Sequence, residues 1–191
     1  MLSVIIPTLN SERVLALTLS VLIPGAMSGL VREVTVVDGG SSDKTLEIAD
    51  GAGCAMLASR DSLGSRLRAA AAAARSPWLM FLRPGTVLES SWLDETTQFI
   101  NEAELRGAVG GAAVFRKSVS AQASQPVIRE AMVLLTFGLF RRVHPDQGLL
   151  IGVGLYKEVG GHRDSAADPE ADFLDRLGRR RILMLRSGAR R

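Results

Sequence analysis

The sequence predicts an α/β fold with a mainly parallel, twisted β-sheet flanked by helices. Three observations lead to this prediction. Short, largely apolar runs, such as LSVII at residues 2–6, are typical of strands buried on both faces of a parallel sheet. Segments with helical periodicity separate these runs. Polar loops containing glycine follow several of the runs, so strands and helices alternate along residues 1–116 up to a fifth strand.

Each element in this half has a local signal. The first helix has Asn10 or Ser11 as its cap and is expected to end at Pro24-Gly25. Ser42 and Asp43 cap the second helix, and alanine favours the third. The fourth carries an apolar face. The predicted strands are 2–6, 31–37, 54–58, 78–82 and 107–115, and the later helices are 44–50, 66–75 and 90–105.

The second part of the chain, residues 117–191, is less regular. It holds an apolar helix at 127–141, a strand-like run at 148–153, a helix near 170–177 and a last strand at 182–185. No repeat or low-complexity linker divides the sequence. We therefore expect the 191 residues to form one domain.

Composition excludes several classes of protein. Hydrophobic residues make up 47% of the chain, which is enough for a core and too many for disorder. The net charge is +3, but no helix-turn-helix, zinc or RNA-binding signature accompanies it, so we expect no nucleic-acid partner. Cys54 is the only cysteine, which fits a reducing compartment, and no signal peptide is recognisable. These features predict a cytoplasmic protein.

A ligand is expected beyond the carboxyl ends of the parallel strands. Three polar loops follow strands there, at residues 7–10, 38–41 and 83–86. Asp38, at a strand end, can accept hydrogen bonds from a base or a ribose, or it can cap the turn that follows it. Glycines 39 and 40 allow the backbone to approach a ligand closely.

Two of these segments carry a family resemblance. SVIIPTLNSE at 3–12, followed by EVTVVDGGSSDKT at 33–45, resembles the opening of glycosyltransferase family 2, the inverting enzymes of GT-A fold. HPDQGLLI, YKEVGGHRD and the segment from Asp168 to Leu185 resemble its acceptor half, closest to a short bacterial branch with DGGSxD and DQG motifs. The resemblance covers nearly the whole chain. It implies a nucleotide-binding half at 1–116 and an acceptor-binding half at 117–191.

The resemblance also implies a reaction and a set of site residues. An acceptor hydroxyl attacks a sugar bound to a nucleoside diphosphate, of uridine type by preference, while a carboxylate takes the proton. The carboxylate is Glu170, with Asp172 as the local alternative. The nucleotide-binding residues are Pro7, Thr8, Asn10, Glu12, Asp38, Gly39, Gly40 and either Arg60 or Arg66, and the acceptor side has Asp146, Gln147 and His162, the last of which fits a core role as well.

The sequence departs from the family at the end of the fourth strand. The family reads like FLDAD or FLHAD there and holds a divalent metal, whereas this chain reads FLRPG. Arg83 and Gly85 leave no carboxylate for a hard cation, so neither Mg²⁺ nor Mn²⁺ is expected. Three interpretations of Arg83 stay open. It stands in for the metal at the diphosphate; or catalysis is lost and the chain only binds a nucleotide or a partner protein; or Arg83 points to solvent.

One further segment bears on the acceptor. AMVLLTFGLFRR, at 131–142, has an apolar run followed by two arginines. As an interfacial helix it would meet anionic headgroups, which would make the protein membrane-associated and the acceptor lipid-linked. Packing of the same helix against the sheet is the alternative.

Overall fold

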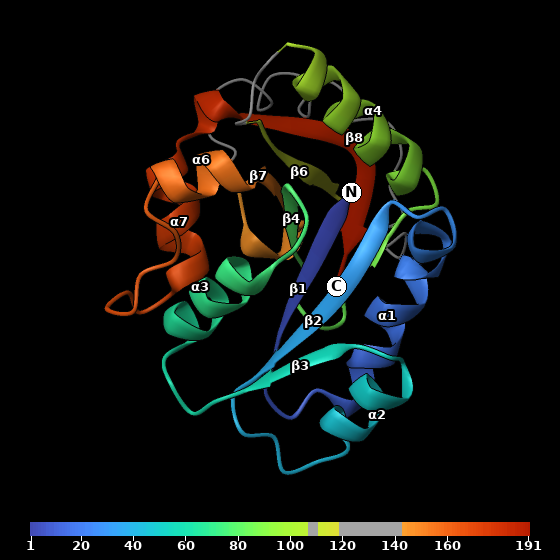
Figure 1. Cartoon of the computed structure of the whole chain (residues 1–191), viewed down its shortest axis with the longest axis vertical. Helices are drawn as coiled ribbons and strands as arrows, with labels where there is room; N and C mark the ends of the chain where they lie inside the picture. The colour runs from blue at the N-terminus through green and yellow to red at the C-terminus, as the bar shows by residue number, and fades with distance from the viewer. Residues whose placement is uncertain (107–110, 119–142) are drawn as a thin grey trace, which may run out of the picture.

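The computed structural model describes residues 1–106, 111–118 and 143–191. Within them, the expected alternation of strands and helices is present (Figure 1). The strands are β1 (Leu2–Thr8), β2 (Val31–Asp38), β3 (Ala55–Ala58), β4 (Trp78–Phe81), β5 (Val87–Leu88), β6 (Ala112–Lys117), β7 (Leu149–Gly152) and β8 (Ile182–Arg190). The helices are α1 (Glu12–Met27), α2 (Thr45–Gly51), α3 (Leu63–Ala73), α4 (Trp92–Leu105), α6 (Val153–Glu158) and α7 (Pro169–Leu177), with short 3₁₀ helices η1 (Pro145–Gln147) and η2 (Arg179–Arg181). The helix expected at 127–141 lies outside the described residues.

The sheet has the strand order β3-β2-β1-β4-β7-β6-β8-β5. Its first half, from β3 to β4, is parallel. In the second half β7 runs antiparallel to both β4 and β6, while β6 and β8 are parallel. The α/β prediction is confirmed, but β6 is not the neighbour of β4. The fully buried run Leu149–Gly152 takes that place instead.

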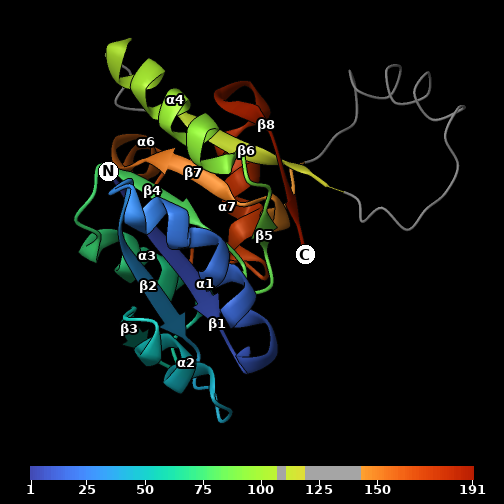
Figure 2. The ribbon, with the colours of Figure 1, turned by 90° about the vertical axis from the view of Figure 1, so that its right-hand side faces the viewer.

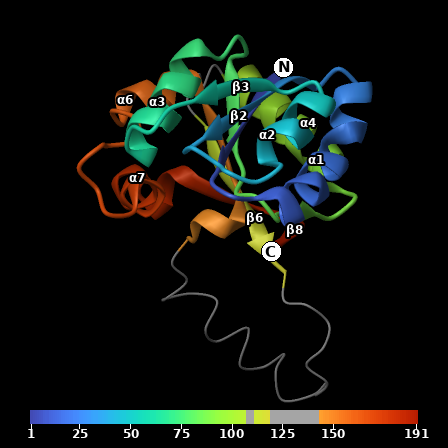
Figure 3. The same ribbon diagram turned by 90° about the horizontal axis from the view of Figure 1, so that it is seen from below.

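Two layers of helices cover the sheet, α3, α6 and α7 on one side and α1, α2 and α4 on the other (Figure 3). Each strand contributes side chains to the cores on both sides of the sheet, because successive side chains point to opposite faces. Val4 and Ile6 of β1 belong to the core beneath α1 and α4, and Ile5 belongs to the core beneath α3 and α7. All seven residues of β1 are buried, as the largely apolar run at 2–6 predicts.

The end of helix α1 was predicted wrongly. Pro24 lies inside the helix, which continues to Met27. The carbonyl of Pro24 still accepts a helical hydrogen bond from Ser28 N at 3.0 Å. Gly25 packs so closely on the Trp92 ring that a β-carbon there would lie 2.6 Å from it. The helix therefore continues past Pro24 because Gly25 allows its last turn to pack on α4.

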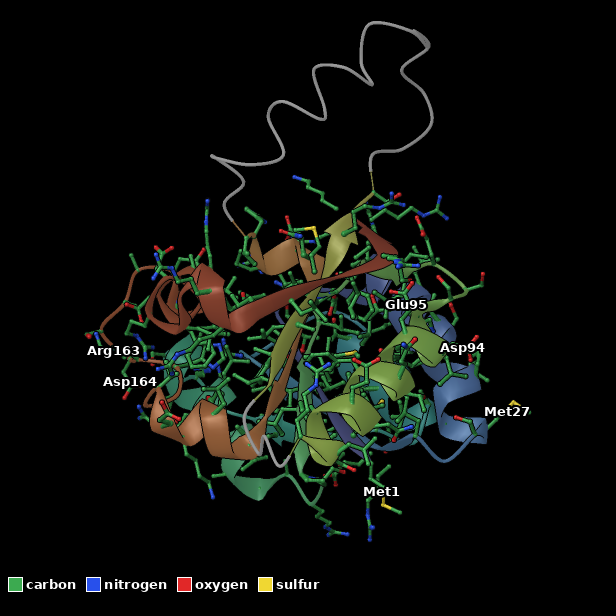
Figure 4. The ribbon with its side chains drawn as sticks, turned by 90° about the horizontal axis from the view of Figure 1, so that it is seen from above. Met1, Met27, Asp94, Glu95, Arg163 and Asp164 are labelled. Carbon is green, nitrogen blue, oxygen red and sulfur yellow. The ribbon has the colours of Figure 1, made fainter. Side chains whose placement is uncertain are left out.

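Strand β8 is longer than predicted, and a bulge against β6 lies within it. Glu95 of α4 fills the bulge, because its Oε2 accepts hydrogen bonds from Arg186 N at 2.7 Å and Ser187 N at 2.9 Å. Figure 2 shows α4 beside β6 and β8, and Figure 4 labels Glu95 on this helix. Since β8 runs parallel to β6, and β6 to β4, the end of β8 reaches the rim at which β1, β2 and β4 also end.

Candidate functional site

An open cleft of about 330 Å³ lies at this rim. Its volume is in the range of small-molecule sites. Four parts of the chain meet in it: the end of β1, helix α3, the loop after β4, and the two C-terminal elements α7 and β8. The lining residues are Pro7, Thr8, Leu9, Ser11, Leu63, Arg66, Arg83, Pro84, Glu170 and Arg191.

Asp38 stands behind the cleft and is fully buried. Its Oδ1 accepts hydrogen bonds from Thr8 Oγ1 at 2.8 Å and from Ser41 Oγ, and its Oδ2 accepts from the backbone N–H groups of Gly40 and Ser41 at 2.8 and 2.7 Å. Burial by itself would raise the pKa of Asp38, but the donors of Ser41, Thr8 and Gly40 outweigh it and lower the pKa. In this conformation the carboxylate joins the loops after β1 and β2.

Asn10 and Glu12 complete the same junction. Asn10 has a φ of 49°, a left-handed conformation that asparagine tolerates. Its N–H donates to Ser41 Oγ at 2.8 Å, and its Oδ1 accepts from Ser42 N at 2.9 Å. Glu12 Oε2 accepts from Lys44 N at 3.0 Å. These two side chains hold the loops in place and are outside the cleft lining.

Of the two arginines considered for the nucleotide, Arg66 lines the cleft and Arg60 is exposed outside its lining. Arg66 is only 9% exposed. It donates from Nη1 to the carbonyl of Val37 at 2.9 Å and from Nε to that of Asp61 at 3.2 Å. A β-carbon at Gly39 would lie 3.0 Å from the guanidinium. Because Gly39 has no side chain, there is room beside it for the guanidinium of Arg66.

Arg83 is the centre of a carboxylate cluster. Its Nε donates to Glu170 Oε2 at 2.7 Å, its Nη1 lies 3.2 Å from Asp146 Oδ1, and its Nη2 lies 3.6 Å from Asp168 Oδ2. The side chain is 20% exposed. The interpretation in which Arg83 points to solvent is therefore wrong.

Glu170 is the buried carboxylate of the cleft, 7% exposed. Asp168 caps α7 by accepting from Glu170 N at 3.1 Å and Ala171 N at 3.0 Å, which fixes Glu170 in the first turn. Burial raises the pKa of Glu170, and the opposing charge and hydrogen bond of Arg83 do not cancel this effect. Oε1 of Glu170 has no hydrogen-bond partner among the described residues, so one oxygen is held and the other is left for a ligand.

The other expected site residues lie elsewhere. Asp172 is paired with Arg176 at 2.8 Å, outside the cleft lining. Gln147 is 2% exposed and donates to the carbonyl of Phe115 at 2.8 Å, a bond that anchors η1 to β6. The cleft lining thus contains Pro7, Thr8, Arg66, Arg83 and Glu170 from the predicted set.

His162 is part of the core and is 1% exposed, so it offers almost no surface to an acceptor. Its ring packs against Phe81 and Phe173, and its Nδ1 lies 2.9 Å from the hydroxyl of Tyr156. Burial lowers the pKa of His162 to about 3, and the charge of Arg176 adds to this effect. Of the two roles considered for this residue, the structure supports packing.

Arg191 also lines the cleft and was not among the predicted site residues. Its Nε donates to the carbonyl of Pro84 at 3.0 Å, and its Nη1 donates to Asp146 Oδ1 at 3.0 Å. Asp146 is thereby shared by two arginines. Burial would raise the pKa of Asp146, but Arg191 and Arg83 together lower it. The sequence shows a cluster of arginines after residue 175. Which of them reaches the cleft depends on the course of β8.

The described residues do not fit a divalent cation at this rim. Asp146, Asp168 and Glu170 all face the guanidinium of Arg83, which occupies the position between them. Among the residues with assigned positions, no group of three His, Cys, Asp or Glu side chains has the arrangement of a metal site. A cation would have to displace Arg83 from three carboxylates.

Comparison with known proteins agrees with this architecture. The model of the family "Glycosyl transferase family 2" matches residues 3–148. A search of the curated proteins gave no match. Residues 1–349 of TarS from S. aureus are 18% identical, with a TM-score of 0.72 over 99% of this chain and 59% of that chain. Glucosyl-3-phosphoglycerate synthase from Mycobacterium tuberculosis, solved with Mn²⁺, UDP and glucosyl-3-phosphoglycerate, is 20% identical, with a TM-score of 0.66 over 98% and 70%.

This likeness shows the fold, which is of the GT-A type that the sequence predicts. The chain spans about three fifths of the length of the TarS fragment. TarS structures also exist with UDP and with UDP-GlcNAc.

Proposed function

Because this chain belongs to glycosyl transferase family 2, we propose that it transfers a sugar from a nucleoside-diphosphate donor to an acceptor hydroxyl, with inversion and without a divalent metal. One observation carries the proposal. Glu170 is a buried carboxylate on the cleft wall, and Arg83 fixes one of its oxygens while the other is left for a ligand. A general base needs this combination of fixed position and raised pKa.

The donor is a uridine diphosphate sugar in this proposal. Two proteins of the same fold have been solved with UDP, and one of them also with UDP-GlcNAc. Arg66 lines the cleft and supplies a positive charge for the nucleotide, and Thr8 lines it with its hydroxyl bonded to Asp38. Three further side chains act indirectly, because they hold the loops after β1 and β2 in place: Asp38, Asn10 and Glu12.

The chemistry that these residues support is a single displacement. The acceptor hydroxyl attacks the anomeric carbon, and Glu170 takes the hydroxyl proton as the new C–O bond forms. The bond between that carbon and the phosphate oxygen breaks, and its electron pair leaves with the nucleoside diphosphate. Arg83 holds Glu170 in position and offsets part of the negative charge of the acidic cluster.

The two halves of the chain have different tasks in this reaction. The donor half, 1–116, supplies Thr8, Arg66 and Arg83, and the acceptor half, 117–191, supplies Glu170 and Asp146. The segment 131–142, on which a lipid-linked acceptor and membrane contact rest, is outside the described residues. None of the helices in the described ranges is long and apolar enough to cross a bilayer.

One observation favours a second candidate, a nucleotide-binding module without catalysis. Three carboxylates compensate the charge of Arg83 instead of leaving it for the departing diphosphate. In that case nucleotides bind in the cleft and no sugar is released.

The test compares binding with turnover. The protein is mixed with UDP, UDP-glucose, UDP-GlcNAc and GDP-mannose, each with and without EDTA, while melting temperature and release of the nucleoside diphosphate are followed. The enzyme predicts stabilisation and release that both persist in EDTA. In Glu170→Gln the release is lost while the stabilisation by the nucleotide remains. Stabilisation without release in any condition supports the binding module. Release that disappears in EDTA and returns with Mn²⁺ contradicts the metal-free mechanism.

A further inference from the structure

The three arginines of the cleft differ in how their charges are compensated. Arg83 faces three carboxylates, so an anion that approached it would meet their negative charge as well. Arg66 is nine-tenths buried and bonds to two backbone carbonyls, with no carboxylate in salt-bridge distance among the described residues. A buried charge without a counter-charge is costly, so Arg66 favours an anion in the cleft.

Arg191 is different from both. Its side chain is 46% exposed, and its one ionic partner among the described residues is Asp146. The oxygen that it contacts, Oδ1, also accepts from Arg83 Nη1. Its Nη2 has no hydrogen-bond partner within the described ranges. Arg191 can therefore release Asp146 without leaving that carboxylate unpaired. Asp146 keeps its ion pair with Arg83 and lies 3.1 Å from His144 Nδ1.

The loop that follows β4 keeps the guanidinium of Arg191 at the cleft. Arg191 Nε donates a hydrogen bond to the carbonyl of Pro84 in this loop. Gly85 in that loop has a φ of +88°, a conformation that favours glycine, and its N–H donates to Thr18 Oγ1 at 2.8 Å. The loop is thus tied to α1 on one side and to Arg191 on the other.

We propose that Arg191 is the cation that binds the diphosphate of the donor, and that it does so by exchanging Asp146 for a phosphate oxygen, in the cleft that the fixed charge of Arg66 also lines. A guanidinium forks onto phosphate oxygens, and a half-exposed one can move to do so. Arg83 then stays with Glu170 as a positioning residue. This inference rests on the proposed function only in taking the anion to be a diphosphate.

The exchange predicts effects of opposite sign for its two partners. Arg191→Ala removes the phosphate contact, so binding of inorganic pyrophosphate and of UDP weakens about tenfold. Asp146→Asn removes the carboxylate that competes with the anion, so both bind several-fold more tightly. A purely structural role of Asp146 predicts weaker binding instead. Titration calorimetry in EDTA at one fixed salt concentration measures all four constants.

Arg190→Ala is the matched control, because it removes the same charge from the neighbouring exposed residue of β8. It is expected to leave both affinities within about twofold. Arg191→Lys keeps the charge without the fork and is expected to lie between wild type and Arg191→Ala. Equal melting temperatures of the variants exclude a folding defect.

The outcomes separate this inference from the proposed function. If wild type binds UDP and Arg191→Ala binds it equally well, the inference is overturned while the proposed function stands. If Asp146→Asn binds pyrophosphate and UDP more weakly than wild type, the exchange of Asp146 for a phosphate oxygen is overturned, whatever the result for Arg191→Ala. If wild type binds neither pyrophosphate nor UDP, both the inference and the proposed function fail.

Discussion

Asp38 and Glu170 are both buried carboxylates at the rim of the sheet, yet their surroundings differ. Asp38 accepts four hydrogen bonds from uncharged groups, two of them backbone N–H groups. Glu170 accepts from one guanidinium, and its second oxygen has no partner among the described residues. Burial opposes the charge of both groups, but the donors lower the pKa of Asp38, while the pKa of Glu170 is raised.

The difference indicates which carboxylate can do chemistry. Four fixed donors stabilise only the ionised form of Asp38, so it holds its loops at any pH above its lowered pKa. Arg83 positions one oxygen of Glu170, the other has no hydrogen-bond partner among the described residues, and the pKa of the group is raised. A carboxylate with a raised pKa is the stronger base of the two, so Glu170 is the better candidate for the general base. The following predictions test this contrast, from the largest expected effect to the smallest.

Glu170→Gln has the largest expected effect, because it removes the proton acceptor and keeps the shape of the side chain and one oxygen that can accept from Arg83. Sugar transfer is expected to fall about 10²- to 10⁴-fold, with little change in donor affinity. The measurement is initial rate against donor concentration. Asp172→Asn is the control, because Asp172 was the alternative base and is paired with Arg176 away from the cleft. A large loss in Asp172→Asn with none in Glu170→Gln would reverse the assignment.

Asp38→Asn is expected to act on stability. It replaces one of two acceptor oxygens with an NH₂ group, so the donors that bonded to that oxygen lose their acceptor. We expect the free energy of unfolding to fall by about 3 kcal/mol. Urea unfolding followed by circular dichroism measures it. Asp164→Asn, in an exposed pair with Arg68, is the control and should change stability little. Figure 4 labels Asp164 on the outside of the molecule, beside Arg163.

The two carboxylates also differ in how far the sequence could predict them. Thr8, Asp38 and Asn10 follow adjacent parallel strands, so their meeting was predictable from the strand pattern alone. The partners of Glu170 were not, because Arg83 is 87 residues away and meets it only when β7 inserts beside β4. Arg191 reaches the cleft because β8 runs parallel to β6 and extends past its predicted end. The sequence indicated neither the pairing nor the direction of these strands.

His162 adds a third buried titratable group that accepts no proton. Its pKa in the folded state is lowered to about 3, whereas an unfolded histidine titrates near 6.5. Between these values the unfolded chain binds the extra proton, so stability falls as pH decreases from 6.5. At pH 5 the loss is about 2 kcal/mol. His162→Gln should lower stability at pH 7 and flatten its dependence on pH between 7 and 5, and parallel slopes in the two proteins would contradict this.

Arg83→Gln gives the smallest expected effect and tests the contrast most directly. Arg83 lowers the pKa of Glu170, whereas Asp168 and Asp146 raise it, so removing the guanidinium leaves only raising influences. The base must be ionised to act. The acid limb of the pH–rate profile should therefore move to higher pH.

The same profile for Arg190→Gln, which removes a charge outside the cleft, should not move. If the acid limb of the Arg83→Gln profile moves to lower pH, or does not move, then the charge of Arg83 does not lower the pKa of Glu170. Asp38 supplies the last check, because no limb of the rate profile should belong to it: its four donors keep it ionised throughout the range in which Glu170 gains its proton.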